Sequence, residues 1–215
     1  MSVPPAGRHE SMRARIQRAL DGQTRAGPPG GWLNGDEGAA LLDREPGRTR
    51  TPAAVLLGLI DHPAPDVTTV LLTQRTAHLR DHAGQVAFPG GRVEPEDKGP
   101  VDTALREAEE EVGLPPDRVE ILGFLPPYDT VTGFRIQPVV GWVRPPEGFR
   151  PQPFEVADVF EVPLGFVLDP ANHQRRRGMR NGRERTFYVL PYENRYIWGA
   201  TAGMLVNFAR LVGAA

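Results

Sequence analysis

The chain has 215 residues, which is enough for one domain with a full hydrophobic core. Hydrophobic residues make up 40% and charged residues 24%, as in ordinary globular proteins, and a net charge of −2 gives no reason to expect nucleic acid as a partner. Cysteine is absent, which excludes disulfides and zinc–thiolate sites, and no apolar run could span a bilayer, so we expect a cytoplasmic protein that binds no membrane.

The N-terminal part of the chain combines one short helix with a long Gly/Pro-rich stretch. Apolar residues at four-residue spacing predict a helix over 9–20. Glycine and proline are then frequent over 27–50, a composition that is typical of a loop. We therefore predict an N-terminal helix and extension over 1–50, followed by a single domain over 51–215.

From residue 51 onwards, the pattern changes to short apolar runs separated by turn residues, which is typical of strands. Helical periodicity occurs twice in this region, at 101–112 and near 198–212. Many strands with two or three helices predict an α/β (α+β) fold, with a mixed β-sheet between helices. A basic run at 173–180 could contact phosphates, although we expect a solvated loop there. The predicted strands cover residues 53–60, 68–75, 84–90, 119–125, 136–143, 156–164 and 185–192.

The predicted helix at 101–112 carries several glutamates along one edge. At about 100° per residue, Glu107, Glu110 and Glu111 share an arc of about 100°. That arc borders an apolar stripe, whereas Glu109 faces away from it. Like charges that are partly desolvated at such a border are costly, and a divalent cation with oxygen ligands would remove that cost. The alternative is a solvated surface helix that binds no ligand.

A glycine turn before this helix makes the metal hypothesis more specific. The stretch FPGGRVEPED (88–97) places two glycines between a predicted strand and an acidic loop, and paired glycines let backbone groups approach a metal or phosphate. Together with REAEEEVGL (106–114), this stretch resembles the signature of the Nudix hydrolases, whose fixed helix positions are all matched. The loop is one residue longer than in the common pattern, and we expect its acid, Asp97, to stabilise the loop or to lie in the outer shell of the site, and not to act as a base.

A second block resembles one branch of that family, the coenzyme A pyrophosphatases. The stretch LLTQRTAHLRDHAGQVAFPGG (71–91) is similar to the additional motif of this branch, and the longer loop fits the same branch. The resemblance implies that Arg75, Arg80 and Gly91 contact the substrate. The 3′-phosphate of coenzyme A would suit guanidinium groups, although the two arginines could equally form salt bridges with acidic side chains.

The resemblance also implies a metal site within a Nudix-type mixed sheet flanked by helices. Its ligands would be Glu107, Glu110 and Glu111, helped by the carbonyl of Gly90, and its ion would be Mg²⁺ or Mn²⁺. The pyrophosphate of a substrate is charged and poorly electrophilic. A cation would therefore neutralise it while a positioned water attacks phosphorus.

Two catalytic roles follow from the same resemblance. Arg106 is adjacent to Glu107 and would orient a carboxylate through a bidentate pair, or would form an ordinary surface salt bridge. The general base would be either Glu155, which lies just before a predicted strand, or Glu110.

The activity implied by the resemblance is hydrolysis of the pyrophosphate bond of coenzyme A or its derivatives, giving 3′,5′-ADP and 4′-phosphopantetheine or its acyl form. The partner would be this small-molecule substrate, with pairing into a homodimer as a further expectation. ADP-ribose, NADH or another nucleoside diphosphate derivative is an alternative substrate. A second alternative is a non-catalytic nucleotide-sensing Nudix module, although such modules usually lose some carboxylates and all three are present here.

Overall fold

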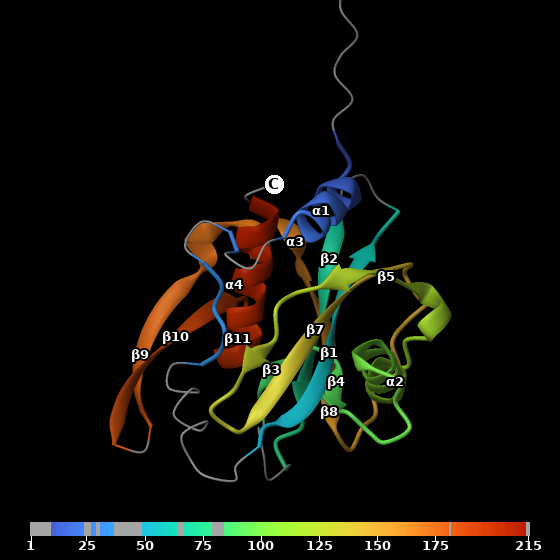
Figure 1. Ribbon diagram of the computed structural model, residues 1–215. Helices are drawn as coiled ribbons and strands as arrows, with labels where there is room; N and C mark the ends of the chain where they lie inside the picture. The colour runs from blue at the N-terminus through green and yellow to red at the C-terminus, as the bar shows by residue number, and fades with distance from the viewer. Residues whose placement is uncertain are drawn as a thin grey trace, which may run out of the picture.

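The structure is a computed structural model that describes residues 10–23, 27–28, 31–36, 49–63, 67–78, 84–180 and 182–213 (Figure 1). Within these ranges, no helix has both the length and the apolarity to cross a membrane. In chain order, the elements are α1 (Met12–Asp21), β1 (Thr51–Asp61), β2 (Thr68–Arg75), β3 (Val86–Ala87), β4 (Gly90–Arg92), α2 (Pro100–Val112), the short helix η2 (Pro116–Arg118), β5 (Val119–Phe124), β6 (Tyr128–Asp129), β7 (Phe134–Val143), β8 (Val156–Pro163), α3 (Leu164–Leu168), the short helix η3 (Pro170–Asn172), β9 (Gln174–Arg180), β10 (Arg183–Tyr192), β11 (Arg195–Trp198) and α4 (Gly199–Gly213).

The strand β1 lies at the centre of an eight-stranded mixed sheet. It pairs in parallel with β7, from Thr51 opposite Phe134 to Ile60 opposite Val143. The end of β1 pairs antiparallel with β2, and its first half pairs antiparallel with β4. On the outer sides, β5 and β6 pair with β7, while β3 and β8 pair with β2. A separate three-stranded sheet has the order β11-β10-β9.

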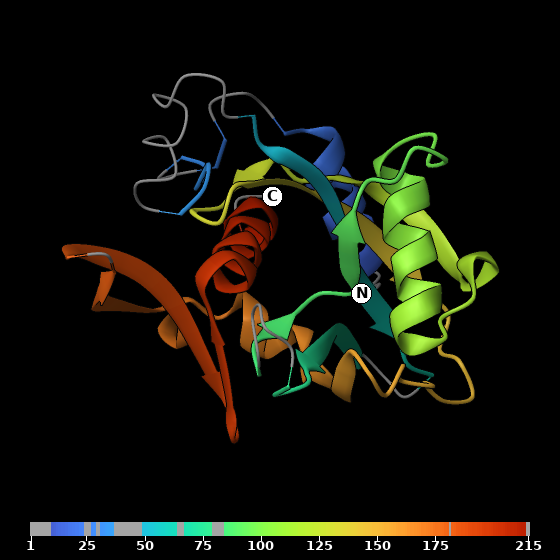
Figure 2. The same cartoon turned by 90° about the horizontal axis from the view of Figure 1, so that it is seen from below.

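Alternating side chains of β1 build a hydrophobic core on each face of the main sheet. Val55, Leu57 and Leu59 join a larger cluster that includes side chains of α1, α3 and α4. Leu56 and Ile60 join a smaller cluster with side chains of α2. This period of two is expected for a strand that is buried on both faces. Figure 2 shows α2 and α4 on opposite sides of the sheet, so the predicted mixed sheet between helices is confirmed.

The helix α2 packs small apolar side chains onto the sheet and leaves its glutamates at the border. Ala104, Ala108 and Val112 are buried, as the predicted apolar stripe requires. Pro100 begins the helix, where its missing N–H costs no hydrogen bond. Gly113 ends it in the left-handed conformation, with φ 67°. The predicted helix is thereby confirmed.

Two predictions of local structure were wrong. The single strand predicted at 84–90 is two short strands, β3 and β4, because Pro89 between them has no N–H to donate to a ladder. The solvated loop expected at 173–180 is mostly the strand β9, which pairs with β10 from Gln174 opposite Val189 onwards. Pairing with β10 supplies its backbone hydrogen bonds, so β9 forms without an apolar alternation of its own. The short elements α3, β6 and β11 are additional to the predicted set.

The helix α1 and the segment 31–36 both pack onto the larger core. Ile16 and Leu20 of α1 are buried in the cluster that contains α4. In the segment, the N–H of Leu33 donates to Oδ1 of Asn207 at 2.8 Å, and the Leu33 carbonyl accepts from Nδ2 of Asn207 at 2.9 Å. The predicted N-terminal helix is confirmed, and the boundary between extension and domain stays a prediction.

Candidate metal and active site

The candidate site lies where β4 pairs with β1 beside α2, and two glycines allow the close approach of these elements. Gly90 has φ 156°, and a Cβ there would lie 2.4 Å from the carbonyl oxygen of Ala54 and 2.6 Å from Cα of Val55. Because both neighbours are backbone atoms, only glycine fits without moving a strand. At Gly91, a Cβ would lie 2.4 Å from Oε1 of Glu107. The space that a side chain would fill at Gly91 therefore holds a carboxylate.

Glu111 is the most deeply buried of the three glutamates of this site, with 6% of the residue exposed. Its Oε2 accepts a hydrogen bond from the backbone N–H of Gly90 at 3.2 Å, and its Oε1 lies 3.7 Å from Nη1 of Arg75. Burial raises the pKa of this carboxyl to about 8, against the effect of the Gly90 amide, and the negative charge of Glu107 adds to the rise. A cation beside Glu111 would stabilise its charged form.

Glu107 and Glu110 lie next to Glu111 with progressively more solvent access. Nη1 of Arg106 donates to Oε1 of Glu107 at 3.0 Å, and burial still raises the pKa of Glu107. The Glu110 side chain is 60% exposed, and its Oε2 accepts from the same Nη1 at 3.2 Å. The three glutamates share one edge of α2, which we call the carboxylate edge.

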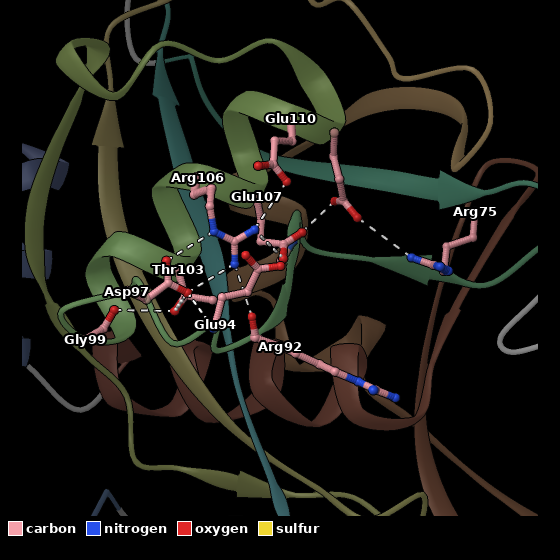
Figure 3. A network of polar contacts seen from close by, with 11 residues as sticks. Arg75, Arg92, Glu94, Asp97, Gly99, Thr103, Arg106, Glu107 and Glu110 are labelled. Atoms are coloured by element: carbon pink, nitrogen blue, oxygen red, sulfur yellow. Dashed lines mark hydrogen bonds and ion pairs between the residues drawn. The ribbon is translucent and has the colours of Figure 1, made fainter.

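Arg106 lies at the centre of a polar network at this edge (Figure 3). Its guanidinium forms a bidentate pair with Asp97, from Nε to Oδ1 and from Nη2 to Oδ2, both at 3.1 Å. Nη2 also donates to the carbonyl of Arg92 at 3.2 Å. The bond from Asp97 raises the pKa of Arg106, and the guanidinium holds the pKa of Asp97 well below its usual range. The bidentate partner of Arg106 is therefore Asp97, while Glu107 receives a single bond.

Asp97 anchors the loop between β4 and α2. Its Oδ2 accepts from the backbone N–H of Glu94 at 2.9 Å and from the hydroxyl of Thr103 at 2.8 Å. The expectation that Asp97 stabilises this loop is confirmed. Thr103 is a member of the network that the sequence analysis missed. Its position four residues before Glu107 on the same helix edge is the signal that could have found it.

The structure brings two more predicted residues to the carboxylate edge. Arg75 contacts Glu111, as described above. Glu155 lies close enough for its charge to raise the pKa of both Glu107 and Glu111. Arg80, the other predicted substrate contact, lies outside the described residues. The catalytic and binding roles of these residues stay predictions.

The carboxylate edge offers oxygen donors that fit a hard divalent cation. Among the described residues, no group of three acidic or histidine side chains forms a ready-made metal-binding cluster. Mg²⁺ does not require one, because it usually keeps several waters and binds through one or two carboxylates together with substrate phosphates. Glu107 occupies the space beside Gly91, and Glu111 is buried with its pKa raised. These two features fit a site that is completed by a cation.

The stability of the metal-free protein is expected to fall as the pH rises from about 4.5 to about 8. The ordinary pKa of Glu111 is 4.5 and its pKa in the fold is about 8, so between these values the folded state holds a proton that the unfolded state has lost. The proton on Glu111 thus stabilises the folded state relative to a charged carboxylate. This stabilisation is fully present below pH 4.5, and the free energy of unfolding falls by up to about 1.4 kcal/mol per pH unit until the pH has passed about 8.

Denaturant unfolding in EDTA across this pH range checks the expectation when the wild type is compared with Glu111→Gln. The glutamine cannot titrate, so the difference in free energy of unfolding between the two proteins should change with pH in favour of the variant. If the free energies of unfolding of the wild type and Glu111→Gln change with pH in parallel, Glu111 has its ordinary pKa in the folded protein.

The chain is similar to known proteins over most of its length. A family model described as the NUDIX domain matches residues 49–181, which is more than half of the chain. A protein named "Uncharacterized Nudix hydrolase NudL" from Shigella flexneri serotype 5b (strain 8401) is 44% identical over 172 residues, covering 80% of this chain and 88% of that protein. The protein of the same name from Escherichia coli (strain K12 / DH10B) is 45% identical over 161 residues, covering 75% of this chain and 82% of that protein. Among solved structures, the MutT protein from Methanosarcina mazei Go1 aligns with a TM-score of 0.49 and 19% identity, covering 78% of this chain and 96% of that chain.

Proposed function

Because this chain belongs to the Nudix hydrolase family, whose enzymes act on pyrophosphate bonds, we propose that its substrate is coenzyme A or a coenzyme A derivative. Hydrolysis would give 3′,5′-ADP and 4′-phosphopantetheine, or the acyl form of the latter. We also expect a cytoplasmic enzyme, and pairing into a homodimer stays a prediction.

The position of Arg75 is the observation that carries this proposal. Arg75 belongs to the block 71–91, which resembles the coenzyme A branch, and its Nη1 lies 3.7 Å from Oε1 of Glu111. Its Nε is buried and has no hydrogen-bond partner among the described residues. A phosphate oxygen of the substrate would satisfy this donor. The block that resembles the coenzyme A branch therefore brings to the carboxylate edge a guanidinium that pairs with Glu111 through Nη1 and has an unpaired Nε donor among the described residues.

The metal ligands of the working enzyme would be Glu107, Glu110 and Glu111, with the carbonyl of Gly90. The ion, Mg²⁺ or Mn²⁺, would offset the charge of the pyrophosphate and make a bound water more acidic. The burial of Glu111 and the placement of Glu107 in the space beside Gly91 support this assignment.

Side chains of this protein would position the carboxylates, accept the proton of the attacking water and contact the substrate. Arg106 is a positioning residue, because a single Nη1 donates to both Glu107 and Glu110. Glu155 or Glu110 would take the proton of the attacking water. Glu110 is open to solvent, and the charge of Glu155 acts on the buried carboxylates, which supports both residues as candidates for the general base. Gly91 and Arg80 would contact the substrate.

A comparison of substrates tests the proposal. With Mg²⁺ present, we expect kcat/KM for coenzyme A to exceed that for ADP-ribose by at least about tenfold, since ADP-ribose lacks the 3′-phosphate, and a charge-assisted hydrogen bond to that group would contribute at least about 1.4 kcal/mol. The products should be 3′,5′-ADP and 4′-phosphopantetheine, as separated by chromatography. Glu111→Gln serves as the inactive control.

The other outcomes separate the alternatives. Turnover of ADP-ribose or NADH without turnover of coenzyme A would support pyrophosphate hydrolysis and would contradict the assignment of coenzyme A as the substrate. Tight binding of nucleotides without turnover of any of them would instead indicate a nucleotide-sensing Nudix module.

A further inference from the structure

Glu155 lies in a short turn that is attached to the last residues of α2. The backbone N–H of Gln152 donates to the carbonyl of Glu111 at 2.9 Å. The N–H of Arg150 donates to the carbonyl of Val112 at the same distance, 2.9 Å. Both carbonyls belong to the C-terminal end of the helix, where no intrahelical donor remains for them. The turn is therefore bonded to the backbone of a predicted metal ligand.

Gln152 also closes this turn with its own side chain. Its Oε1 accepts from the backbone N–H of Phe154 at 2.6 Å and from that of Glu155 at 3.0 Å. Its backbone carbonyl accepts from the N–H of Glu155 at 3.1 Å and from the N–H of Val156 at 2.8 Å. A side-chain oxygen that binds the amides two and three residues ahead acts as the N-cap of a helix does. The path of the backbone at Glu155 is thus set from Gln152.

A β-bulge separates the regular ladder of β2 and β8 from this turn. Gln74 lies opposite Asp158. The next residue, Arg75, lies opposite Val156, so β8 contributes one extra residue at this step. Bulges bend a strand and redirect its side chains, and they are frequent beside active sites. On the β2 side of the bulge, the guanidinium of Arg75 points toward the carboxylate edge (Figure 3), and on the β8 side the chain leads directly back to Glu155.

Thr76, which directly follows β2, binds the turn from its other side. Its backbone N–H donates to the carbonyl of Glu155 at 2.9 Å, and its hydroxyl donates to the carbonyl of Phe154 at 2.8 Å. Only 7% of Thr76 is exposed, and a hydrogen bond that is partly shielded from water is costly to lose. The rings of His78 and Phe154 meet edge to face, with centroids 5.0 Å apart. The segment that follows Arg75 and the turn that contains Glu155 are therefore joined.

We propose that Thr76 and Gln152 are positioning residues, which hold the carboxylate of Glu155 beside the carboxylate edge, where it accepts the proton of the attacking water. This inference rests on the proposed function, and it takes Glu155 rather than Glu110 as the general base. The charge of Glu155 contributes to the raised pKa of Glu111, so its carboxylate lies within electrostatic range of the edge. A general base must stay within hydrogen-bond reach of the water that it deprotonates, and a turn that is bonded at both ends meets this requirement.

Steady-state kinetics of three threonine variants test the inference. Thr76→Val removes the hydroxyl, keeps the shape of the side chain and should lower kcat at least about tenfold, with little change in KM or in Mn²⁺ binding. Thr76→Ser keeps the donor and should recover turnover. Thr201→Val is the matched control, because Thr201 is also 7% exposed and its hydroxyl donates to a backbone carbonyl, that of Val86, at 3.0 Å. This control should lose a similar amount of stability and keep the wild-type kcat.

A double-mutant cycle shows whether Thr76 and Gln152 act through Glu155. Glu155→Gln should lower kcat by about a hundredfold. Adding Thr76→Val to it should then change kcat by no more than about twofold. Gln152→Ala, at an exposed position, should lower kcat at least about threefold in the wild type and have no further effect beside Glu155→Gln. Additive losses of activity, the same kcat in Thr76→Val and Thr201→Val, or full activity of Glu155→Gln would overturn the inference.

The choice of substrate separates this inference from the assignment of coenzyme A. The variants are compared on whichever of coenzyme A, ADP-ribose and NADH the wild type hydrolyses fastest. Failure to hydrolyse coenzyme A would therefore contradict the substrate assignment alone. Equal hydrolysis of coenzyme A by the wild type and Thr76→Val would support the proposed function and contradict this inference. A wild type that hydrolyses none of the three substrates would contradict both, because no water would then be deprotonated at this edge.

Discussion

Glu111→Gln is expected to lower Mg²⁺-dependent hydrolysis by about a thousandfold while leaving the fold intact. Glu111 is the buried member of the carboxylate edge, and an amide removes the negative charge that a cation would meet. The amide oxygen can still accept the hydrogen bond from the Gly90 N–H. Since the raised pKa of Glu111 leaves the metal-free carboxyl largely protonated at neutral pH, the glutamine resembles the state already present. Steady-state hydrolysis and thermal unfolding measure the two effects separately.

Glu109→Gln is the matched control for this variant. Glu109 lies on the same helix, carries the same charge and is exposed on the side away from the edge. It should retain wild-type turnover. Loss of activity in Glu109→Gln comparable to that in Glu111→Gln would show that overall helix charge, and not the buried carboxylate, supports the reaction.

Gly91→Ala is expected to reduce turnover by about a hundredfold with little change in the unfolding temperature. The added Cβ would lie 2.4 Å from Oε1 of Glu107, so the carboxylate must move, and the flexible end of this side chain can do so without moving backbone. The site is then displaced while the fold is preserved. Measured kcat and the midpoint of thermal unfolding check the two parts of this expectation.

Gly90→Ala, unlike Gly91→Ala, should act mainly on stability, lowering the free energy of unfolding by roughly 2–4 kcal/mol. Its Cβ would meet the carbonyl oxygen of Ala54 at 2.4 Å, and backbone cannot move aside cheaply. Gly148→Ala is the neutral control, since a Cβ there has no neighbour within 4 Å. If Gly90→Ala unfolds at the wild-type temperature, the backbone of β1 does not approach Gly90 closely enough to exclude a side chain there.

Features that depend on residues close together in the sequence could be predicted. The apolar stripe of α2 and its glutamate edge follow from a period of 3.6 residues, and Ala104, Ala108 and Val112 are buried accordingly. The long strands β1, β2 and β7 follow from apolar runs and lie close to their predicted bounds. The same helical period predicts that Glu107, Glu110 and Glu111 lie on one edge of α2.

Features set by distant partners could not be predicted in this way. The strand β9 is rich in arginine, and its hydrogen bonds come from β10. The bidentate partner of Arg106 is Asp97, nine residues away across a loop whose path the sequence does not encode. The different burial of Glu111 and Glu110 depends on where β4 pairs with β1, since the Gly90 amide donates to Glu111 while Glu110 stays exposed to solvent. These outcomes are decided by tertiary packing.

Mn²⁺ binding in the absence of substrate is the most direct test of the central claim, that the carboxylate edge holds the catalytic cation. The electron paramagnetic resonance signal of free Mn²⁺ reports the bound fraction during a titration of the wild type, Glu109→Gln and Glu111→Gln. The wild type and Glu109→Gln should show the same saturable binding, and Glu111→Gln should bind at least tenfold more weakly. Equal binding by all three proteins would contradict the account, because the cation would then lie elsewhere.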